Sequence, residues 1–251
     1  MTSSAATPGA TRVRVGTAGW SIPRTSANLL AGPGSHLERY AHVLTCSEIN
    51  STFYRPSRLS TYARWAASVP ESFRFSVKAP RAITHDTALA CMPAQIRAFL
   101  DEVQTLGSRL GPILFQLPPK GVFDSAVAEA FFRDLRDLYA GSVVLEPRHE
   151  SWFSHEADGL LREFRVSRVA ADPARTPAAA QPGGDARLLY FRLHGSPRTY
   201  YSAYSPEYLQ DLAVTLRQAS TSADVWCIFD NTAAGAAAAN ALTLTGELAA
   251  G

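Results

Sequence analysis

Ser142-Val-Val-Leu-Glu-Pro-Arg-His-Glu-Ser-Trp152 is the stretch that decides how the chain is interpreted. Its apolar run Val143–Leu145 is typical of a strand that is buried on both faces. Pro147 has no N–H for a neighbouring strand, so the strand ends there. Glu146 and Arg148 share a parity and point the same way. Two charges at the mouth of a buried strand are costly to desolvate. We therefore interpret them as functional, with a stiffening ion pair as the alternative.

Seven other apolar runs, mostly separated by helical patterns, accompany this one along the chain. The predicted strands are Val13–Trp20, Cys46–Asn50, Phe73–Ala79, Leu110–Leu117, Ser142–Arg148, Val166–Asp172, Arg187–His194 and Asp224–Asn231. The predicted helices are His36–Leu44, Ser57–Val69, Pro93–Leu106, Ser125–Leu138 capped by Ser125, His155–Phe164, Glu207–Gln218 and Gly235–Leu248. Pro173–Asp185 is rich in Ala, Pro and Gly, and we expect a loop in place of a helix.

This alternation predicts an α/β fold with parallel strands, and the chain length of 251 residues suits a single (β/α)8 TIM barrel. We place the barrel at residues 12–251, after a disordered tail at residues 1–11. An open doubly wound sheet is the alternative. That fold should carry a glycine-rich nucleotide motif, and Gly16-Thr-Ala-Gly19 is not one. No nucleotide cofactor is expected, and the cofactor is otherwise unknown.

The composition limits the partners and the compartment. A formal net charge of +2 gives no strong field toward nucleic acid or a membrane surface. The three cysteines form no C-x-x-C pair, which is typical of reduced thiols, so we expect a cytoplasmic protein. No apolar run has the length of a membrane helix, and Met1–Thr11 lacks the apolar core of a signal peptide.

Polar side chains occur where the predicted strands end, and in a barrel these ends surround the active site. The carboxylates, amine and imidazole are acid–base candidates, and the expected catalytic residues are Glu48, Lys78, Glu146 and His194. Guanidinium groups suit phosphates or carboxylates, and aromatic rings past the strand ends suit stacking. The expected substrate-binding residues are Asn50, Tyr54, Gln116, Arg148, Trp152, Asp172, Arg192, Tyr200, Tyr201, Asp230 and Asn231.

We expect seven of these side chains to line one cavity: Glu48, Lys78, Gln116, Glu146, Arg148, Arg192 and His194. Glu146 is expected to be ionised and paired with Lys78 or Arg192 as well as Arg148. A metal site built from Glu146, Asp172 and His194 is the less favoured alternative, because the spacing does not support it.

Several stretches carry a further likeness: Val15–Trp20, Glu48–Tyr54, Phe73–Lys78, Ile83–His85, Gln116–Pro119, Glu146–Trp152, Tyr190–Gly195 and Phe229–Asn231. In this order, between Val13 and Leu248, they resemble the YecE-like family, the domain-of-unknown-function family numbered 72. The resemblance implies a TIM barrel and no established activity. Ser21–Ser35 replaces a longer segment of many members, and Asp230-Asn231 stands where many have Asn-Asn.

These observations favour an enzyme, a hydrolase or lyase, that acts on a small phosphorylated or carboxylated substrate. Glu48 or Glu146 would be the base, and Lys78, Arg148 and Arg192 would bind the anion. One alternative is a nucleic-acid phosphodiester hydrolase or DNA-binding protein, by a loose likeness to the endonuclease IV barrel. Others are glycoside hydrolysis by Glu48 and Glu146, and a non-catalytic anion-binding barrel. Lys78 as a neutral, Schiff-base-forming amine also stays open.

Overall fold

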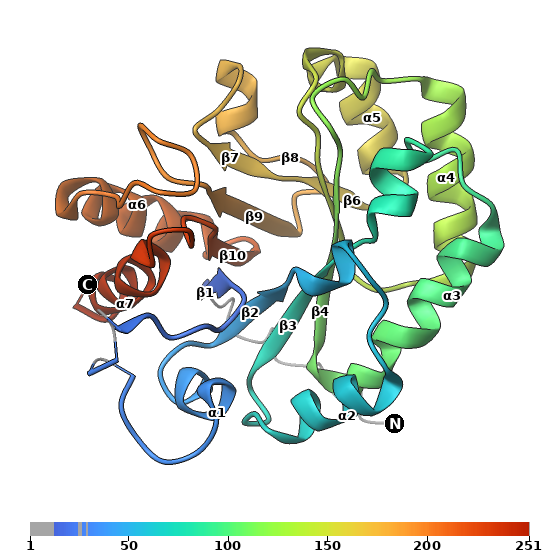
Figure 1. Ribbon diagram of the computed structural model, residues 1–251. Coiled ribbons are helices and arrows are strands. Elements are labelled where there is room, and N and C mark those ends of the chain that lie inside the picture. The colour runs from blue at the N-terminus through green and yellow to red at the C-terminus, as the bar shows by residue number, and fades with distance from the viewer. Residues whose placement is uncertain (1–12, 25–26, 29, 251) are drawn as a thin grey trace, which may run out of the picture.

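The strands form one mostly parallel, nearly closed barrel-like sheet, with helices around it (Figure 1). The computed structural model describes residues 13–24, 27–28 and 30–250. The predicted tail at residues 1–11 lies outside these residues. None of the helices described is long and apolar enough to span a membrane.

Ten strands make up the sheet, in the order β7-β9-β10-β1-β2-β3-β4-β5-β6-β8. They are β1 (Val13–Ala18), β2 (Cys46–Ile49), β3 (Arg74–Lys78), β4 (Leu110–Gln116), β5 (Val143–Glu146), β6 (Val166–Arg168), β7 (Ala170–Asp172), β8 (Gly183–Gly184), β9 (Leu188–Leu193) and β10 (Asp224–Phe229). The helices are α1 (His36–Ala41), α2 (Leu59–Ala67), α3 (Pro93–Val103), α4 (Ser125–Leu138), α5 (His155–Glu163), α6 (Pro206–Ala219) and α7 (Ala236–Ala250).

The strand count differs from the predicted eight in two places. The predicted sixth strand is divided at Val169 into β6, which pairs with β5, and β7, which pairs with β9. The short strand β8 pairs antiparallel with β6 inside the region predicted as a loop. That region, Pro173–Asp185, otherwise holds one short 3-10 helix, Pro177–Ala180, and no α-helix, as its composition indicates.

One predicted helix cap is wrong. Ser125 is the first residue of α4, and the N-cap is Asp124. The Asp124 carboxylate accepts a hydrogen bond from the backbone N–H of Val127 at 3.1 Å. An Asp carboxylate suits this position because it satisfies a free N–H and lies at the positive end of the helix dipole.

Alternation along the strands separates two apolar regions. Outward side chains such as Phe191 and Leu193 of β9 belong to the large core between the sheet and the helices. Inward side chains form a smaller cluster inside the barrel: Cys46, Leu114, Val144, Val169, Leu188, Tyr190, Trp226 and Ile228. The barrel is therefore packed at this level, and its chemistry must lie above it, toward the carboxyl ends of the strands.

Candidate functional site

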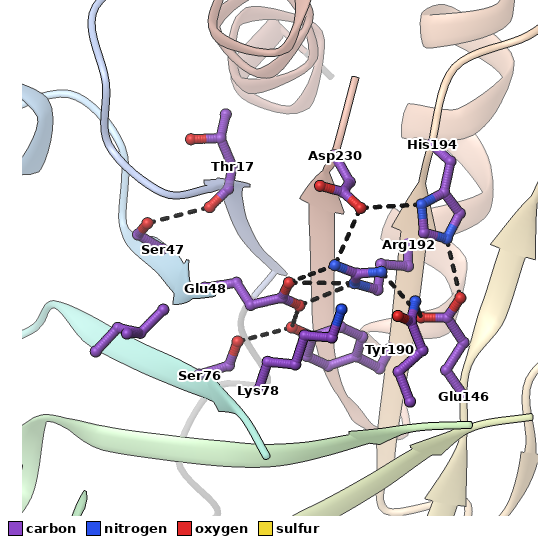
Figure 2. A network of polar contacts seen from close by, with 12 residues as sticks. Thr17, Ser47, Glu48, Ser76, Lys78, Glu146, Tyr190, Arg192, His194 and Asp230 are labelled. Carbon is purple, nitrogen blue, oxygen red and sulfur yellow. Dashed lines mark hydrogen bonds and ion pairs between the residues drawn. The ribbon is translucent and has the colours of Figure 1, made fainter. Parts of the chain in front are cut away.

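A charged layer lies directly above the inner apolar layer, and strand alternation explains it. Side chains two residues further along a strand point to the same face. Each of five polar residues follows an inner apolar residue at this spacing: Glu48 after Cys46, Gln116 after Leu114, Glu146 after Val144, Arg192 after Tyr190 and Asp230 after Ile228. Figure 2 shows these strands directing the labelled members of the set toward one another.

Arg192 is the centre of this layer and is fully buried. Its guanidinium contacts carboxylates from three other strands: Glu48 at 2.6 Å, Glu146 at 3.0 Å and Asp230 at 3.1 Å (Figure 2). A buried guanidinium is tolerated when ion pairs and hydrogen bonds replace its lost hydration. The three carboxylates meet this requirement.

Glu48 is also fully buried and is held by Arg192 and a tyrosine. Arg192 donates to both carboxylate oxygens, with Nε at 3.2 and 3.0 Å. The Tyr190 hydroxyl donates to Oε2 at 2.9 Å and lies 2.7 Å from the Ser76 hydroxyl. Glu48 is therefore occupied on both oxygens, and it holds no free position for a substrate proton in this arrangement.

Glu146 is the most heavily bonded carboxylate. Its Oε2 accepts from Gln116 at 2.9 Å and from Arg192 at 3.0 Å, and its Oε1 faces His194 at 2.9 Å and Arg148 at 3.3 Å. Burial raises the pKa of Glu146, but the charges of Arg192 and His194 outweigh burial and hold this pKa well below 4.5. The predicted ionised state, with Arg192 and Arg148 as cation partners, agrees with this geometry.

His194 lies between two carboxylates. Its Nε2 faces Glu146, and its Nδ1 lies 3.1 Å from Asp230. Burial lowers the pKa of His194, but Glu146 and the Asp230 hydrogen bond outweigh burial and raise it above 6.5. The pKa of Asp230 is raised by burial but lowered overall by Arg192 and His194. A carboxylate faces each ring nitrogen, and this arrangement favours the imidazolium form, which can donate from both nitrogens.

Lys78 differs from the other charged groups of the layer. Within the described part of the chain, its ammonium makes no hydrogen bond or ion pair, and Figure 2 shows it directed toward Glu48, Arg192 and Tyr190. Its Nζ lies 4.2 Å from the ring centre of Phe53. Burial and the charge of Arg192 lower the pKa of Lys78 to about 8, against the opposing effect of Glu48 and Glu146.

A cavity of about 180 Å³ opens beside this layer. Polar walls come from Glu146, Arg148, His194, Arg175 and Thr199, and the other walls are Pro147, Phe153, Ala171, Pro173, Ala174 and Ala179. The expectation that seven side chains line one cavity is correct for Glu146, Arg148 and His194. Glu48, Gln116 and Arg192 belong to the same hydrogen-bonded cluster but lie outside this cavity, and Lys78 is not in its lining.

Three expected binding residues take other roles. Trp152 is 2% exposed, packs on Phe123 with ring centres 4.9 Å apart, and donates from Nε1 to the carbonyl of Gly121, so it offers no stacking face. Asn231 is fully buried and donates to the Ser202 carbonyl and to Asn240, which ties two loops to α7.

Asp172 is the third. It pairs in register with Leu193, whereas Ala171 pairs with Arg192. Residues in register share a face, so Ala171 points into the barrel and Asp172 points out. Asp172 accepts a hydrogen bond from the Tyr204 hydroxyl at 2.7 Å, on the helix side of the sheet.

The remaining expected residues lie in the segments that follow β2 and β9. Tyr200 lies edge-on to His194 with ring centres 5.7 Å apart, and its hydroxyl is 3.4 Å from the Arg148 guanidinium. Tyr201 is exposed beneath Arg198, and Tyr54 is 81% exposed beside Phe53. Asn50 is half-buried after β2, and its buried amide oxygen has no hydrogen-bond partner among the residues that the structure describes.

Sequence reasoning missed several residues of this region. The Tyr190 hydroxyl donates to Glu48 and contacts the Ser76 hydroxyl, and strand alternation from Arg192 and Lys78 places both side chains inside the barrel. Phe53, which contacts Lys78 and lies 4.9 Å from His85, follows a strand in an irregular segment. Arg175 enters the cavity from the loop after β7. No sequence signal indicated Phe53 or Arg175.

Metal-ligand geometry is not present in the part of the chain that the structure describes, where no three His, Cys, Asp or Glu side chains come together in that way. A second hollow, about 390 Å³, lies at the opposite, amino-terminal end of the strands. Its walls include Arg14, Arg136 and Arg187, but Arg136 donates to four backbone carbonyls and Arg187 pairs with Asp185. These guanidinium groups stabilise that end of the barrel.

Similarity to curated proteins covers part of the chain. The UPF0759 protein YecE of Escherichia coli (strain K12) is 31% identical over 156 residues, which are 60% of this chain and 56% of that protein. Its counterpart in Escherichia coli O157:H7 is 30% identical over 156 residues. The match therefore spans little more than half the length of these relatives.

Solved structures share the fold over nearly the whole chain. A DUF72 family protein from Thermotoga maritima MSB8 has a TM-score of 0.79 and 26% identity, and the match covers 94% of this chain and 99% of that one. A DUF72 family protein from Enterococcus faecalis V583 has a TM-score of 0.79 and 24% identity, with 95% and 96% covered. The family model described as "Protein of unknown function DUF72" matches residues 14–251. The chain therefore belongs to the DUF72 family.

Proposed function

We propose that the protein is an enzyme, built on a (β/α)8 barrel in which β6 and β7 act as one strand, that converts a small phosphorylated or carboxylated substrate. The substrate would bind at the carboxyl ends of the strands, in the cavity beside His194 and Arg148. Because all three cysteines are free, we place the reaction in the cytoplasm.

An excess of positive charge in the layer carries this proposal. The carboxylates are Glu48, Glu146 and Asp230, and the cations are Lys78, Arg148, Arg192 and His194. Three carboxylates against four cations leave one positive charge without a partner. The least committed cations are Lys78 and Arg148. The two contacts of Arg148 to Glu146 are long, at 3.3 and 3.4 Å. A phosphate or carboxylate would complete the set.

The size of the cavity limits the substrate. A cavity of about 150 Å³ holds a molecule the size of benzene, and this one is about 180 Å³. An anion with a compact carbon skeleton fits between Arg148 and the apolar walls, whereas a polynucleotide does not. The net charge of +2 also disfavours tight binding to a nucleic-acid backbone.

The geometry separates the expected catalytic residues by role. Glu48 is bonded to Arg192 and Tyr190, and Glu146 to Arg192 and His194. His194 is bonded to Glu146 and Asp230, so we assign all three residues to positioning and to the electrostatics of the site. Lys78 keeps a free position on its amine and is the group we assign to acid–base or nucleophilic chemistry.

Anion-dependent stability tests this proposal. A ligand that binds only the native state adds about 2.7 kcal/mol at a hundred times its Kd, which is roughly 5–10 °C in Tm for a chain of this size. We expect sulfate and phosphate to raise the Tm of the wild type relative to chloride at equal ionic strength. Arg148→Gln should lose most of this shift, and Arg133→Gln, which removes a surface charge of α4, should keep it. An equal shift in the Arg148 variant would contradict the proposal.

A non-catalytic anion-binding barrel is the second candidate, because the carboxylates of the layer are already paired. It shares the anion-dependent stability but not the reactive amine. A screen of phosphorylated and carboxylated metabolites for turnover, with wild type and Lys78→Arg compared, separates the two candidates.

A further inference from the structure

We propose that Lys78 forms a Schiff base with the carbonyl group of a substrate that also carries a carboxylate or phosphate. The inference rests on the proposed function, because it uses the same anion site, and it names the substrate class: small 2-oxo acids and phosphorylated ketones or aldehydes. Within the described residues, Lys78 is the one charged group of the layer that makes no hydrogen bond or ion pair.

The surroundings of the amine suit a nucleophile. Lys78 is half-buried, so it is largely desolvated and still reachable from the mouth. The Phe53 ring lies 4.2 Å from Nζ on one side, and the carbonyl of Lys78 itself accepts from Thr52 at 2.6 Å, which holds the strand end in place. A lysine becomes a nucleophile when desolvation or a neighbouring cation favours its neutral form.

A neighbouring charge, that of Arg192, also favours the neutral form of Lys78. Arg192 lies close enough to lower the pKa of Lys78, which burial already lowers, and the result is about 8. An ordinary lysine has a pKa of about 10.4, so the neutral fraction of Lys78 at neutral pH is on the order of a hundredfold larger. Glu48, Glu146 and Asp230 oppose this effect only in part, and each of them also pairs with Arg192.

The anion of the substrate would lie near the amine. His85 stacks edge-on against Phe53, and its pKa is lowered first by burial and then by Lys78, Arg81 and Arg148. Lys78 and Arg148 therefore act on the same histidine at the mouth. Because Lys78 is not in the lining of the cavity, a substrate with its anionic group at Arg148 would extend beyond that cavity to place its carbonyl carbon at Nζ.

The step balances without a cofactor or an oxidant. The amine nitrogen of Lys78 forms a bond to the carbonyl carbon, and the carbonyl oxygen leaves as water with both amine hydrogens. The product is an imine, which takes one proton from solvent to become the iminium. Nothing is oxidised or reduced, and the iminium then withdraws electrons from the adjacent C–H or C–C bond.

The chain contains its own control for the test, because Lys78 and Lys120 are its only lysines. The full-length protein is incubated separately with glyoxylate, pyruvate and dihydroxyacetone phosphate, and borohydride is added. Reduction of an iminium leaves a stable secondary amine, which intact-mass and peptide mass spectrometry locate. We expect one adduct at Lys78 with at least one probe, at least about tenfold more than at exposed Lys120, from its larger neutral fraction.

Matched variants decide the outcome. Lys78→Arg keeps the positive charge and should lose the adduct while it keeps the sulfate-dependent Tm shift, whereas Lys120→Arg should keep both. Sulfate should reduce the adduct in the wild type, because it competes for the anion site. Absence of an adduct with all three probes, or equal labelling of Lys78 and Lys120, would overturn the Schiff base. If the sulfate shift persists in that case, the proposed function stands; if sulfate gives no shift, the proposed function fails on its own.

Discussion

Glu146 accepts hydrogen bonds from four side chains. Gln116, Arg192 and His194 come from β4 and β9 or the end of β9, and Arg148 follows β5, the strand of Glu146 itself. A single buried carboxylate therefore connects the cavity wall to the centre of the barrel. Removing one partner of a buried ion pair leaves the other charge uncompensated and costs about 3–5 kcal/mol. The neutral amide of glutamine in its place would face two guanidinium groups and an imidazolium.

The pH dependence of stability follows from this residue. The folded pKa of Glu146 lies well below 4.5, so the unfolded state binds more protons. Its contribution is present above the unfolded pKa of about 4.3 and is lost as pH falls through the folded pKa. We expect Glu146→Gln to lower the free energy of unfolding by about 3–5 kcal/mol at neutral pH. The variant should also lose less stability than the wild type as the pH falls. Urea unfolding at a series of pH values measures both effects.

Glu129→Gln, which removes a surface partner of Arg133, is the matched control and should change both quantities little. If Glu146→Gln does not fold, NMR titration of the wild-type carboxyl group measures the same property directly. A folded pKa above 4.5 for Glu146 would contradict its assignment as an ionised positioning residue and would make it a general-acid candidate.

At the scale of elements, helix α4 begins at Ser125 as predicted, but its N-cap is Asp124 and not Ser125. Both Asp124 and Ser125 are accepted N-cap types, and only the backbone decides which of them accepts from an N–H. Asp124 is extended and accepts from Val127, whereas Ser125 is already helical. The cap matters for the site because α4 follows β4, which carries Gln116.

Two substitutions test this cap. Asp124→Ala should lower the free energy of unfolding by about 1 kcal/mol, because the N–H of Val127 loses its partner. Ser125→Ala should change it by less, since alanine is a good helix former at a position without a cap bond. Urea unfolding of the two variants measures the difference, and a larger cost for Ser125→Ala would show that the cap assignment is wrong.

Over the whole molecule, opposite sides of the barrel are joined through its interior. The Tyr190 hydroxyl of β9 contacts Ser76 of β3 at 2.7 Å and donates to Glu48 of β2 at 2.9 Å. Tyr190 also stacks on Trp226 with ring centres 6.0 Å apart. It therefore belongs to both layers, with its ring in the apolar layer and its hydroxyl in the charged one.

Tyr190→Phe keeps the ring and removes only the hydroxyl. A hydrogen bond to a charged group contributes about 1.5–3 kcal/mol, so we expect the free energy of unfolding to fall by that amount. Tyr54→Phe removes a hydroxyl from a ring that is 81% exposed and should change stability by less than about 0.5 kcal/mol. Chemical denaturation of both variants is the measurement. A neutral Tyr190→Phe would mean that Glu48 does not depend on this bond.

The sequence by itself determined the alternation of strands and helices and the inward parity of most charged residues. Both are local properties, because side chains two residues apart share a face of a strand. This is why Glu48, Glu146 and Arg192 could be assigned to one end of the barrel before their contacts were known. Asp172 was misassigned because it lies at a strand end: alternation continues unbroken through the inner residue Val169, so Ala171 points inward and Asp172 points outward.

Only the tertiary structure decided which charges are paired and which are free. The carboxylates that neutralise Arg192 come from β2, β5 and the end of β10, up to 144 residues away in the chain. Pairing between such distant residues depends on strand register and on the closure of the sheet, which no local pattern specifies. The same closure buried Trp152 against Phe123 and placed the ammonium of Lys78 beside Phe53, where no carboxylate of the described residues forms an ion pair with it. The free amine on which the proposed chemistry depends is therefore a consequence of the folded barrel.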